Sequence, residues 1–188
     1  MDLIIPKDKC ILTENYPDRV IEGDFRAFIV EDNKKIIHYE KHNVIVEGAR
    51  KIMARSVGDC TEPYCINQFR MGGDNSLDMQ TALNPLPPNP SDIDLVYANN
   101  LFIRNKDDNI LGLPAFVVSY PNEPNETSVL FTVKIGKAEA NNLDPEPTVY
   151  VAAGLFMADG DILFSSQTFP VMSKTTSREF WFEWEIRF

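Results

Sequence analysis

The C-terminal segment "REFWFEWEIRF" constrains the fold more than any other stretch of this sequence. One set of alternate positions carries only large apolar side chains, namely Phe180, Phe182, Trp184, Ile186 and Phe188. Because successive side chains of a strand point to opposite faces, this alternation predicts a β-strand with one buried and one wet face. A chain end frays unless other segments hold it. The strand is therefore expected to complete its own subunit's sheet, or alternatively to add to a neighbour's sheet; the first arrangement is favoured.

Other segments also have strand composition. "AFVVSY", "TSVLFTVKIG", "TVYVAAGLFMA" and "DILFSSQTF" are separated by Pro, Asn, Asp or Gly turns, and Asp159-Gly160 marks the tip of a hairpin. Upstream, residues 19–40 predict a β-hairpin, in which "DNKK" is the turn between "FRAFIVE" and "IIHYE". "INQFRMGGDNS" predicts a short strand that runs into a Gly-Gly turn.

Residues 43–58, "NVIVEGARKIMARSVG", form the one good helix candidate. Asn43 can cap the N-terminus, Gly58 can end the helix, and an apolar stripe repeats at helical spacing. Further along, residues 84–91 contain four prolines, which favour an extended surface loop or contact arm.

Together these elements predict a mainly β fold with one α-helix. We expect an antiparallel β-sandwich or a mixed sheet with the helix packed on it, plus an extended N-terminal arm or hairpin. The predicted organisation is an N-terminal arm and β-hairpin over residues 1–40 and a β-rich structural domain over residues 41–188. The Pro-rich loop at 84–91 interrupts that domain.

Charge and hydropathy exclude several classes of partner. The chain of 188 residues has a formal net charge of −10, which argues against binding a nucleic-acid backbone or an anionic membrane surface. No apolar run approaches the roughly 20 residues needed to span a bilayer. The first residues also lack the features of a signal peptide, so synthesis in the cytoplasm is expected.

The three cysteines, Cys10, Cys60 and Cys65, are too few for a disulfide scaffold. They are expected to be reduced thiols, or alternatively to include an unpaired thiol that reaches a neighbouring subunit. His38 and His42 precede "CTEPYC", which reverses the usual finger order and widens its cysteine spacing. No metal site is therefore expected.

Catalytic motifs are not evident in the sequence. "MGGDNS" lacks the lysine and the following helix of a phosphate loop, and no nucleophile elbow is present. An acidic hydrolase would need a cluster of perturbed carboxylates that a sequence cannot display. We expect neither an enzyme nor a cofactor.

The order of motifs in the C-terminal half resembles structural proteins of tailed-bacteriophage virions, especially tail, baseplate and fibre-associated components. The elements that carry the resemblance are Glu139-Ala140-Asn141, Gly154-Leu155-Phe156, Asp159-Gly160, Leu163-Phe164, Phe169-Pro170, Lys174 and Trp184–Phe188. Upstream, "NVIVEGARKIMARSV" and "INQFRMGGDN" resemble the helix and turn that precede that block. This chain departs from the pattern at "VAAGLF", where related proteins often carry an acidic residue.

The resemblance implies a non-enzymatic virion component of the tail, collar, baseplate or fibre attachment, assembled in the host cytoplasm. Its implied partners are further copies of itself, as a trimer or higher oligomer, and other virion tail or neck proteins. The expected packing and assembly anchors are aromatic and aliphatic side chains of the C-terminal half: Phe156, Phe164, Phe169, Phe180, Phe182, Trp184, Ile186 and Phe188.

An alternative function is a carbohydrate- or receptor-binding module of a tail fibre. Its sequence signal would be exposed aromatic side chains grouped with Asp and Asn in loops. "VYANNLF" at 96–102 and "SYPNEPNET" at 119–127 are the candidate loops.

Overall fold

Strand pairing in the computed structural model, which describes residues 22–42, 44–46, 65–121, 128–141, 147–157 and 162–187, shows how the C-terminal segment is held. The segment forms β12 (Glu179–Arg187), which lies between β1 and β9 in the middle of a sheet. Trp184 is opposite Phe25 of β1 on one side and Phe131 of β9 on the other. The favoured prediction is confirmed, since this strand completes the sheet of its own chain.

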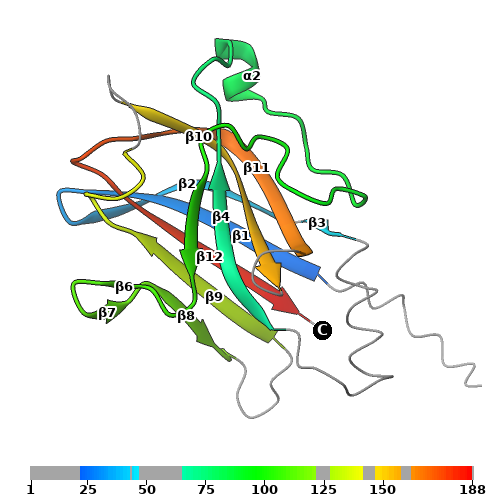
Figure 1. Ribbon diagram of the computed structural model, residues 1–188, viewed down its shortest axis with the longest axis vertical. Helices are drawn as coiled ribbons and strands as arrows, with labels where there is room; N and C mark the ends of the chain where they lie inside the picture. Colours follow the sequence, from blue (N-terminus) through cyan, green and yellow to red (C-terminus); the bar gives the residue numbers. More distant parts are fainter. Residues whose placement is uncertain are drawn as a thin grey trace, which may run out of the picture.

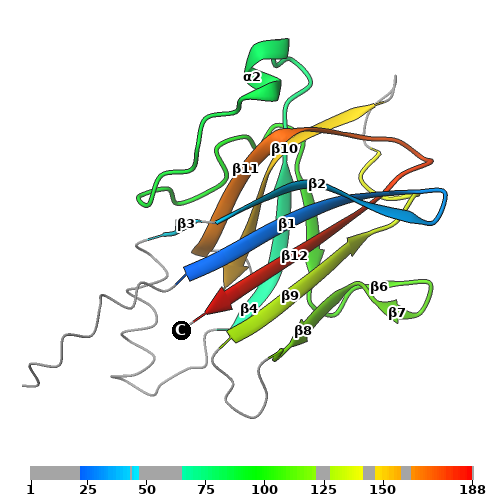
Figure 2. The ribbon, with the colours of Figure 1, turned by 180° about the vertical axis from the view of Figure 1, so that it is seen from behind.

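Two five-stranded sheets account for most of the described residues (Figures 1 and 2). Sheet A has the order β2-β1-β12-β9-β8, with β1 (Glu22–Glu31), β2 (Lys34–His42), β8 (Phe116–Ser119) and β9 (Ser128–Ile135) around β12. Sheet B has the order β3-β11-β10-β4-β5, comprising β3 (Val44–Ile45), β4 (Ile66–Gly72), β5 (Phe102–Asn105), β10 (Thr148–Met157) and β11 (Ile162–Lys174). A third, two-stranded sheet joins β6 (Asn109–Ile110) to β7 (Leu113–Pro114).

All pairings in these sheets are antiparallel. Side chains of both large sheets meet in one buried cluster, so the fold is an antiparallel β-sandwich rather than a mixed sheet. The predicted hairpin at residues 19–40 is β1–β2, and its strand β1 pairs with β12 over nine positions, from Glu22↔Arg187 to Val30↔Glu179. The hairpin and the C-terminal strands therefore belong to one sheet.

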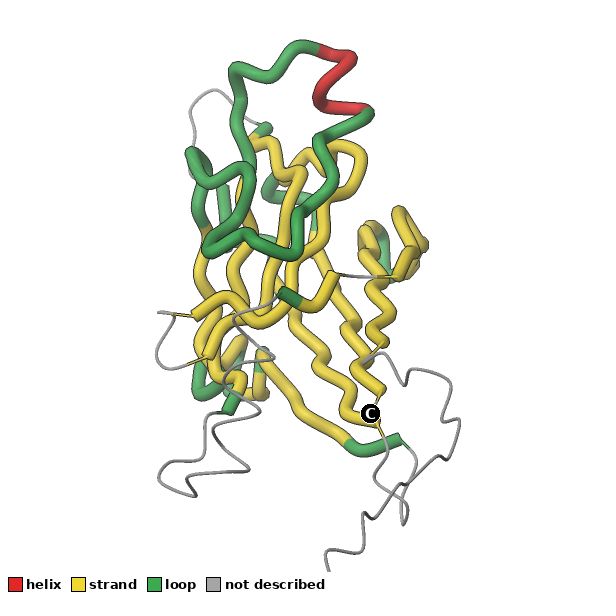
Figure 3. Tube along the Cα trace, turned by 90° about the vertical axis from the view of Figure 1, so that its right-hand side faces the viewer, coloured by secondary structure: helices red, strands yellow, loops and turns green. Residues whose placement is uncertain are grey.

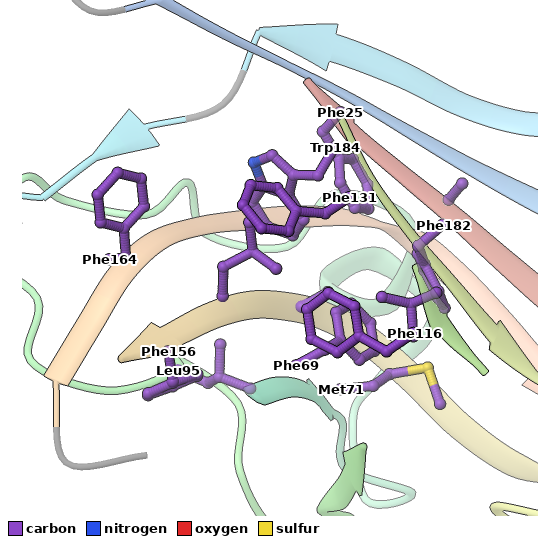
Figure 4. Close-up of a cluster of buried hydrophobic side chains, with 14 of the residues drawn as sticks. Phe25, Phe69, Met71, Leu95, Phe116, Phe131, Phe156, Phe164, Phe182 and Trp184 are labelled. Carbon is purple, nitrogen blue, oxygen red and sulfur yellow. The ribbon is translucent and has the colours of Figure 1, made fainter. Parts of the chain in front are cut away.

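Alternation along β12 is confirmed by burial. Phe180, Phe182, Trp184 and Ile186 are each at most 1% exposed, whereas the side chains between them are partly exposed. Figure 4 shows Phe25, Phe69, Phe182 and Trp184 gathered between the sheets. The Phe25 and Trp184 ring centroids are 4.7 Å apart at 67°, an edge-to-face geometry that aromatic rings favour.

The outer face of sheet A carries ion pairs across its strands. Arg187 Nη1 of β12 contacts Asp24 of β1, and Lys35 Nζ of β2 lies 2.6 Å from Glu183 Oε1 of β12. The same lysine covers the Phe28 ring, with Nζ 3.8 Å from the ring centroid. These pairs explain why the outer face of β12 carries charged side chains at every position except Trp181.

The helix prediction at residues 43–58 is wrong at its start. Val44–Ile45 forms β3 and pairs with Ser165 and Ser166 of β11, while Ile45 and Val46 are buried in the core. Consecutive β-branched side chains favour extended backbone, and pairing with the edge of β11 reinforces that preference. Residues 47–58 lie outside the described part of the chain. The helix that the structure describes is α2 (Met79–Leu83), which lies between the predicted Gly-Gly turn and the Pro-rich loop, where no helix was expected.

Candidate functional site

The predicted anchor residues lie in the core of a single chain. Phe156, Phe164 and Phe169 are at most 3% exposed, like the inward side chains of β12. Phe169 stacks on Phe25, with centroids 5.7 Å apart and planes at 15°, so it links sheet B to sheet A. Phe188 lies outside the described residues. The packing of these side chains is intramolecular, and their role in assembly stays a prediction.

The predicted thiol and imidazole groups do not converge. Cys65 is exposed, and Cys10 and Cys60 lie outside the described residues. His38 Nε2 lies 2.9 Å from the carbonyl oxygen of Pro170, and His42 Nδ1 lies 2.6 Å from Asp24 Oδ1. Within the residues that the structure describes, no three His, Cys, Asp or Glu side chains are grouped as metal ligands.

Two parts of the C-terminal motif meet in a buried polar network. Lys174 is fully buried, and its ammonium donates to the carbonyl oxygens of Lys137 and Thr175, each 3.0 Å away. It also donates to Asn141 Oδ1 at 3.2 Å. Tyr150 Oη donates to the Ala140 carbonyl at 3.0 Å. The network therefore fixes the turn after β9, which contains the motif residues 139–141.

The side chain of Glu139, in the same turn, is fixed by a separate set of hydrogen bonds. Its carboxylate accepts hydrogen bonds from Arg104 and from the Gly136 N–H. Burial by itself raises the pKa of Glu139. The bonds from Arg104 and Gly136, with the charges of Arg104 and Lys174, outweigh burial and lower that pKa below its ordinary value. Glu139 is thus an ionised structural group rather than a proton donor at neutral pH.

A long excursion between β4 and β5, residues 73–101, forms a lobe that projects from one end of the sandwich (Figure 3). Its base is closed by reciprocal backbone hydrogen bonds between Gly73 and Asn100, at 2.7 and 3.1 Å. A Cβ atom on Gly73 would lie 1.9 Å from the carbonyl oxygen of Val149, so only glycine fits there. The predicted Gly-Gly turn is therefore the point where the lobe leaves the sheet.

Side-chain hydrogen bonds order the interior of the lobe. Asn99 Nδ2 donates to Asp74 Oδ2 and Asn100 Nδ2 donates to Asn75 Oδ1, each at 2.6 Å. Tyr97 Oη accepts from the Leu86 N–H at 3.0 Å and thereby holds the Pro-rich loop. The polar groups of the candidate glycan loop "VYANNLF" thus make internal bonds. In the second candidate loop, residues 122–127 lie outside the described part of the chain.

Aspartate side chains shape the turns of the lobe. Asp78 caps α2, because its carboxylate accepts from the N–H groups of Gln80 and Thr81 at 2.9 and 3.1 Å. Hydrogen bonds from Thr81 lower the pKa of Asp78, and those from Ser76 lower the pKa of Asp74. Both carboxylates are therefore negatively charged at neutral pH.

The surface of the lobe combines this acidity with exposed apolar groups. Residues 73–101 contain four aspartates and no lysine, arginine or histidine. Large apolar side chains of the lobe that face solvent are Met79, Leu83, Leu86, Ile93, Val96 and Leu101. Ile93 is 87% exposed and Leu86 is 65% exposed, so packing inside the chain does not explain them. This acidic, apolar lobe is the candidate functional site.

A groove of about 310 Å³ lies where the lobe meets the sandwich. Leu83, Pro85 and Pro87 line it from the lobe, and Tyr39 and Pro170 line it from β2 and β11. Lys41, Asn84 and Thr168 also line the groove, so its surface is mixed polar and apolar. Sequence reasoning identified the prolines but not this surface, because the exposure of the apolar side chains depends on how the lobe folds.

Comparisons with protein-family models, with curated proteins and with solved structures found no significant match. No helix in the described part of the chain is long and apolar enough to cross a membrane.

Proposed function

We propose that the chain is a non-enzymatic structural component of a tailed-bacteriophage virion, located in the tail, collar, baseplate or fibre attachment. It acts through contacts with further copies of itself and with neighbouring tail or neck proteins. The observation that carries this proposal is the lobe, which presents exposed apolar side chains on an internally ordered loop. The motif order of the C-terminal half supports the virion assignment.

The lobe has the properties of a protein-binding surface. Loops of this length in a folded domain are usually functional, and exposed apolar patches with polar surroundings mark interaction sites. Internal bonds such as Asn99 to Asp74 order the lobe before binding, which reduces the entropy lost on association. The burial of Leu86 and Ile93 by a partner would supply the driving force.

Charge defines the kind of neighbour that fits the lobe. The lobe has four carboxylates and no basic residue of its own, although Asp94 lies 3.8 Å from Arg70 of β4. Its net negative charge repels acidic surfaces and attracts basic ones. The partner at the lobe is therefore a virion protein whose surface combines basic and apolar side chains. A second copy of this chain fits less well there, since each copy has a formal net charge of −10.

Incorporation into particles tests this function. A double variant, Leu86→Asp with Ile93→Asp, adds charge to exposed positions and is expected to fold normally. Phage particles produced from the genome that encodes the chain should contain the wild-type protein at a fixed copy number by quantitative mass spectrometry. The lobe variant should be depleted from them, whereas Ile36→Asp, at an exposed position of β2, should be retained. Purified particles without the wild-type protein would overturn the proposal.

A further inference from the structure

The hairpin between β5 and β8 has an unusual tip. Leu111 and Gly112, which join β6 to β7, both have positive φ, at 53° and 79°. Two-residue turns of this kind favour Asn-Gly, because a side chain with a Cβ strains a left-handed backbone. Leu111 is also 98% exposed, so no burial within the chain offsets the strain. Leucine is therefore unfavourable at this position in an isolated chain for two reasons: the backbone is left-handed, and the apolar side chain is exposed to water.

A pocket of about 530 Å³ adjoins the tip. Ile110, Leu113 and Pro114 line it from the hairpin, while Ile135 and Ala138 line it from the end of β9 and the turn that follows. Leu111 is also among the residues that line it, although its side chain is almost fully exposed, and Leu113 is 71% exposed. An apolar projection thus lies directly beside an apolar hollow on the same surface.

Charges around the pocket are balanced, although the whole chain is strongly acidic. The charged lining residues are Lys134, Lys137, Glu139 and Glu179. Lys134 Nζ lies 4.4 Å from the Trp181 ring centroid, and Glu139 is held by Arg104. Lys137 is exposed, and the partly exposed Glu179 accepts a long hydrogen bond, 3.4 Å from Trp181 Nε1 to its Oε2. We therefore assign Lys137 and Glu179 as the pair of opposite charges that faces a partner. Two copies that meet at this surface bring lysine to glutamate instead of repelling each other.

We propose that the hairpin tip and the adjoining pocket form a two-fold contact between two copies of this chain. Leu111 of each copy enters the pocket of the other, and Lys137 of each copy faces Glu179 of the other. A two-fold axis requires a surface that is complementary to itself, and an adjacent projection and hollow with balanced charges meet that requirement. The contact lies away from the lobe, since the hairpin is at the lower left and α2 at the top of Figure 1. It deepens the proposed function, on which it rests, by naming a second copy as one partner.

The substitution Leu111→Asn tests the contact by sedimentation equilibrium of the full chain. Asparagine suits the left-handed turn, so the variant should unfold at the same temperature as the wild type or higher. It removes the apolar projection, so its dissociation constant for self-association should rise by about tenfold or more. Ile37→Asn, at an exposed position of β2, is the matched control and should change that constant by less than about twofold.

A charge exchange provides a second readout. Lys137→Glu and Glu179→Lys should each weaken self-association, and the two substitutions together should restore it. Failure of the double variant to restore association would overturn the charge pairing. If the wild type associates and Leu111→Asn associates equally well, the hairpin contact is wrong while the proposed function stands. A wild-type chain that remains monomeric would overturn this contact, whereas the proposed function is tested separately by the presence of the protein in particles.

Discussion

Lys174 Nζ, from a fully buried side chain, and Oδ1 of the partly buried Asn141 are 3.2 Å apart, although the two residues are 33 positions apart in the sequence. This bond belongs to the network that holds the turn after β9, and the ammonium also donates to two backbone carbonyls. A buried cation is tolerated because these acceptors replace its lost hydration.

Replacement of Lys174 by methionine should destabilise the protein by about 3 kcal/mol, because three partly buried acceptors lose the donor that the fully buried lysine supplies. Urea unfolding followed by tryptophan fluorescence measures the change. Lys134→Met is the matched control, since Lys134 lies on the outer face of sheet A, and it should change stability by less than about 1 kcal/mol. Equal losses in both variants would contradict the structural role of the Lys174 network.

The two tryptophans of β12 provide a matched pair on opposite faces of one strand. Trp184→Ala removes a ring that is 1% exposed and should cost about 4 kcal/mol of the free energy of unfolding. Trp181→Ala removes a partly exposed ring from the outer face and should cost about 1 kcal/mol. Denaturant titration of both variants tests the assignment of faces, which would be wrong if Trp181 proved the more important.

Truncation tests the central position of β12. Removal of the last nine residues, 180–188, deletes most of the strand between β1 and β9, so each neighbour loses its hydrogen-bonding partner on that side and keeps only its outer one. Buried backbone groups without partners are strongly unfavourable. The truncated chain should therefore fail to give soluble folded protein, as judged by solubility and circular dichroism. Soluble, cooperatively unfolding protein would contradict this prediction.

Acid should lower the free energy of unfolding, because some carboxylates have a depressed pKa in the folded state. The pKa of Asp24 is lowered mainly by a hydrogen bond from Arg187. Burial of Asp24 acts in the opposite direction, and the contact with His42 lowers the pKa further. Burial raises the pKa of Glu139, but the hydrogen bonds from Arg104 and Gly136 outweigh burial, so that this pKa is also lowered. Because both pKa values are lower in the folded than in the unfolded state, the two carboxylates stabilise the fold fully above their ordinary pKa values of 3.8 and 4.5. This stabilisation is lost as the pH falls through the pKa values of the folded state.

The midpoint of urea unfolding should therefore stay nearly constant between about pH 7 and pH 5 and decrease below that range. Glu139→Gln should lower the midpoint at neutral pH and reduce its dependence on acid pH. A midpoint in the wild type that rises on acidification would contradict these signs.

Local pattern was sufficient to predict most strands. Alternation from Phe180 to Ile186 gave the correct buried face of β12, and turn residues separated the strands around it. The start of the predicted helix was wrong because the β-branched pair Val44–Ile45 finds a partner in β11, which is distant in sequence. The short helix α2 was missed, although Asp78 before "MQTAL" is a local capping signal.

The candidate site depends on contacts that no local pattern contains. Asn99 meets Asp74 across 25 residues, and only this closure makes residues 73–101 an ordered lobe. Arg104 meets Glu139 across 35 residues in the same way. Sequence composition indicated acidity and proline, but the exposure of Ile93 follows from the tertiary structure.

The mass of the purified full chain in solution, measured by light scattering on a size-exclusion peak with and without reductant, tests self-assembly most directly. We expect a discrete oligomer under both conditions, because the proposed contact between copies is formed by side chains other than cysteine. An oligomer that dissociates on reduction would instead assign the contact to a thiol such as the exposed Cys65. A monomer under both conditions, across the accessible range of protein concentration, would contradict self-assembly.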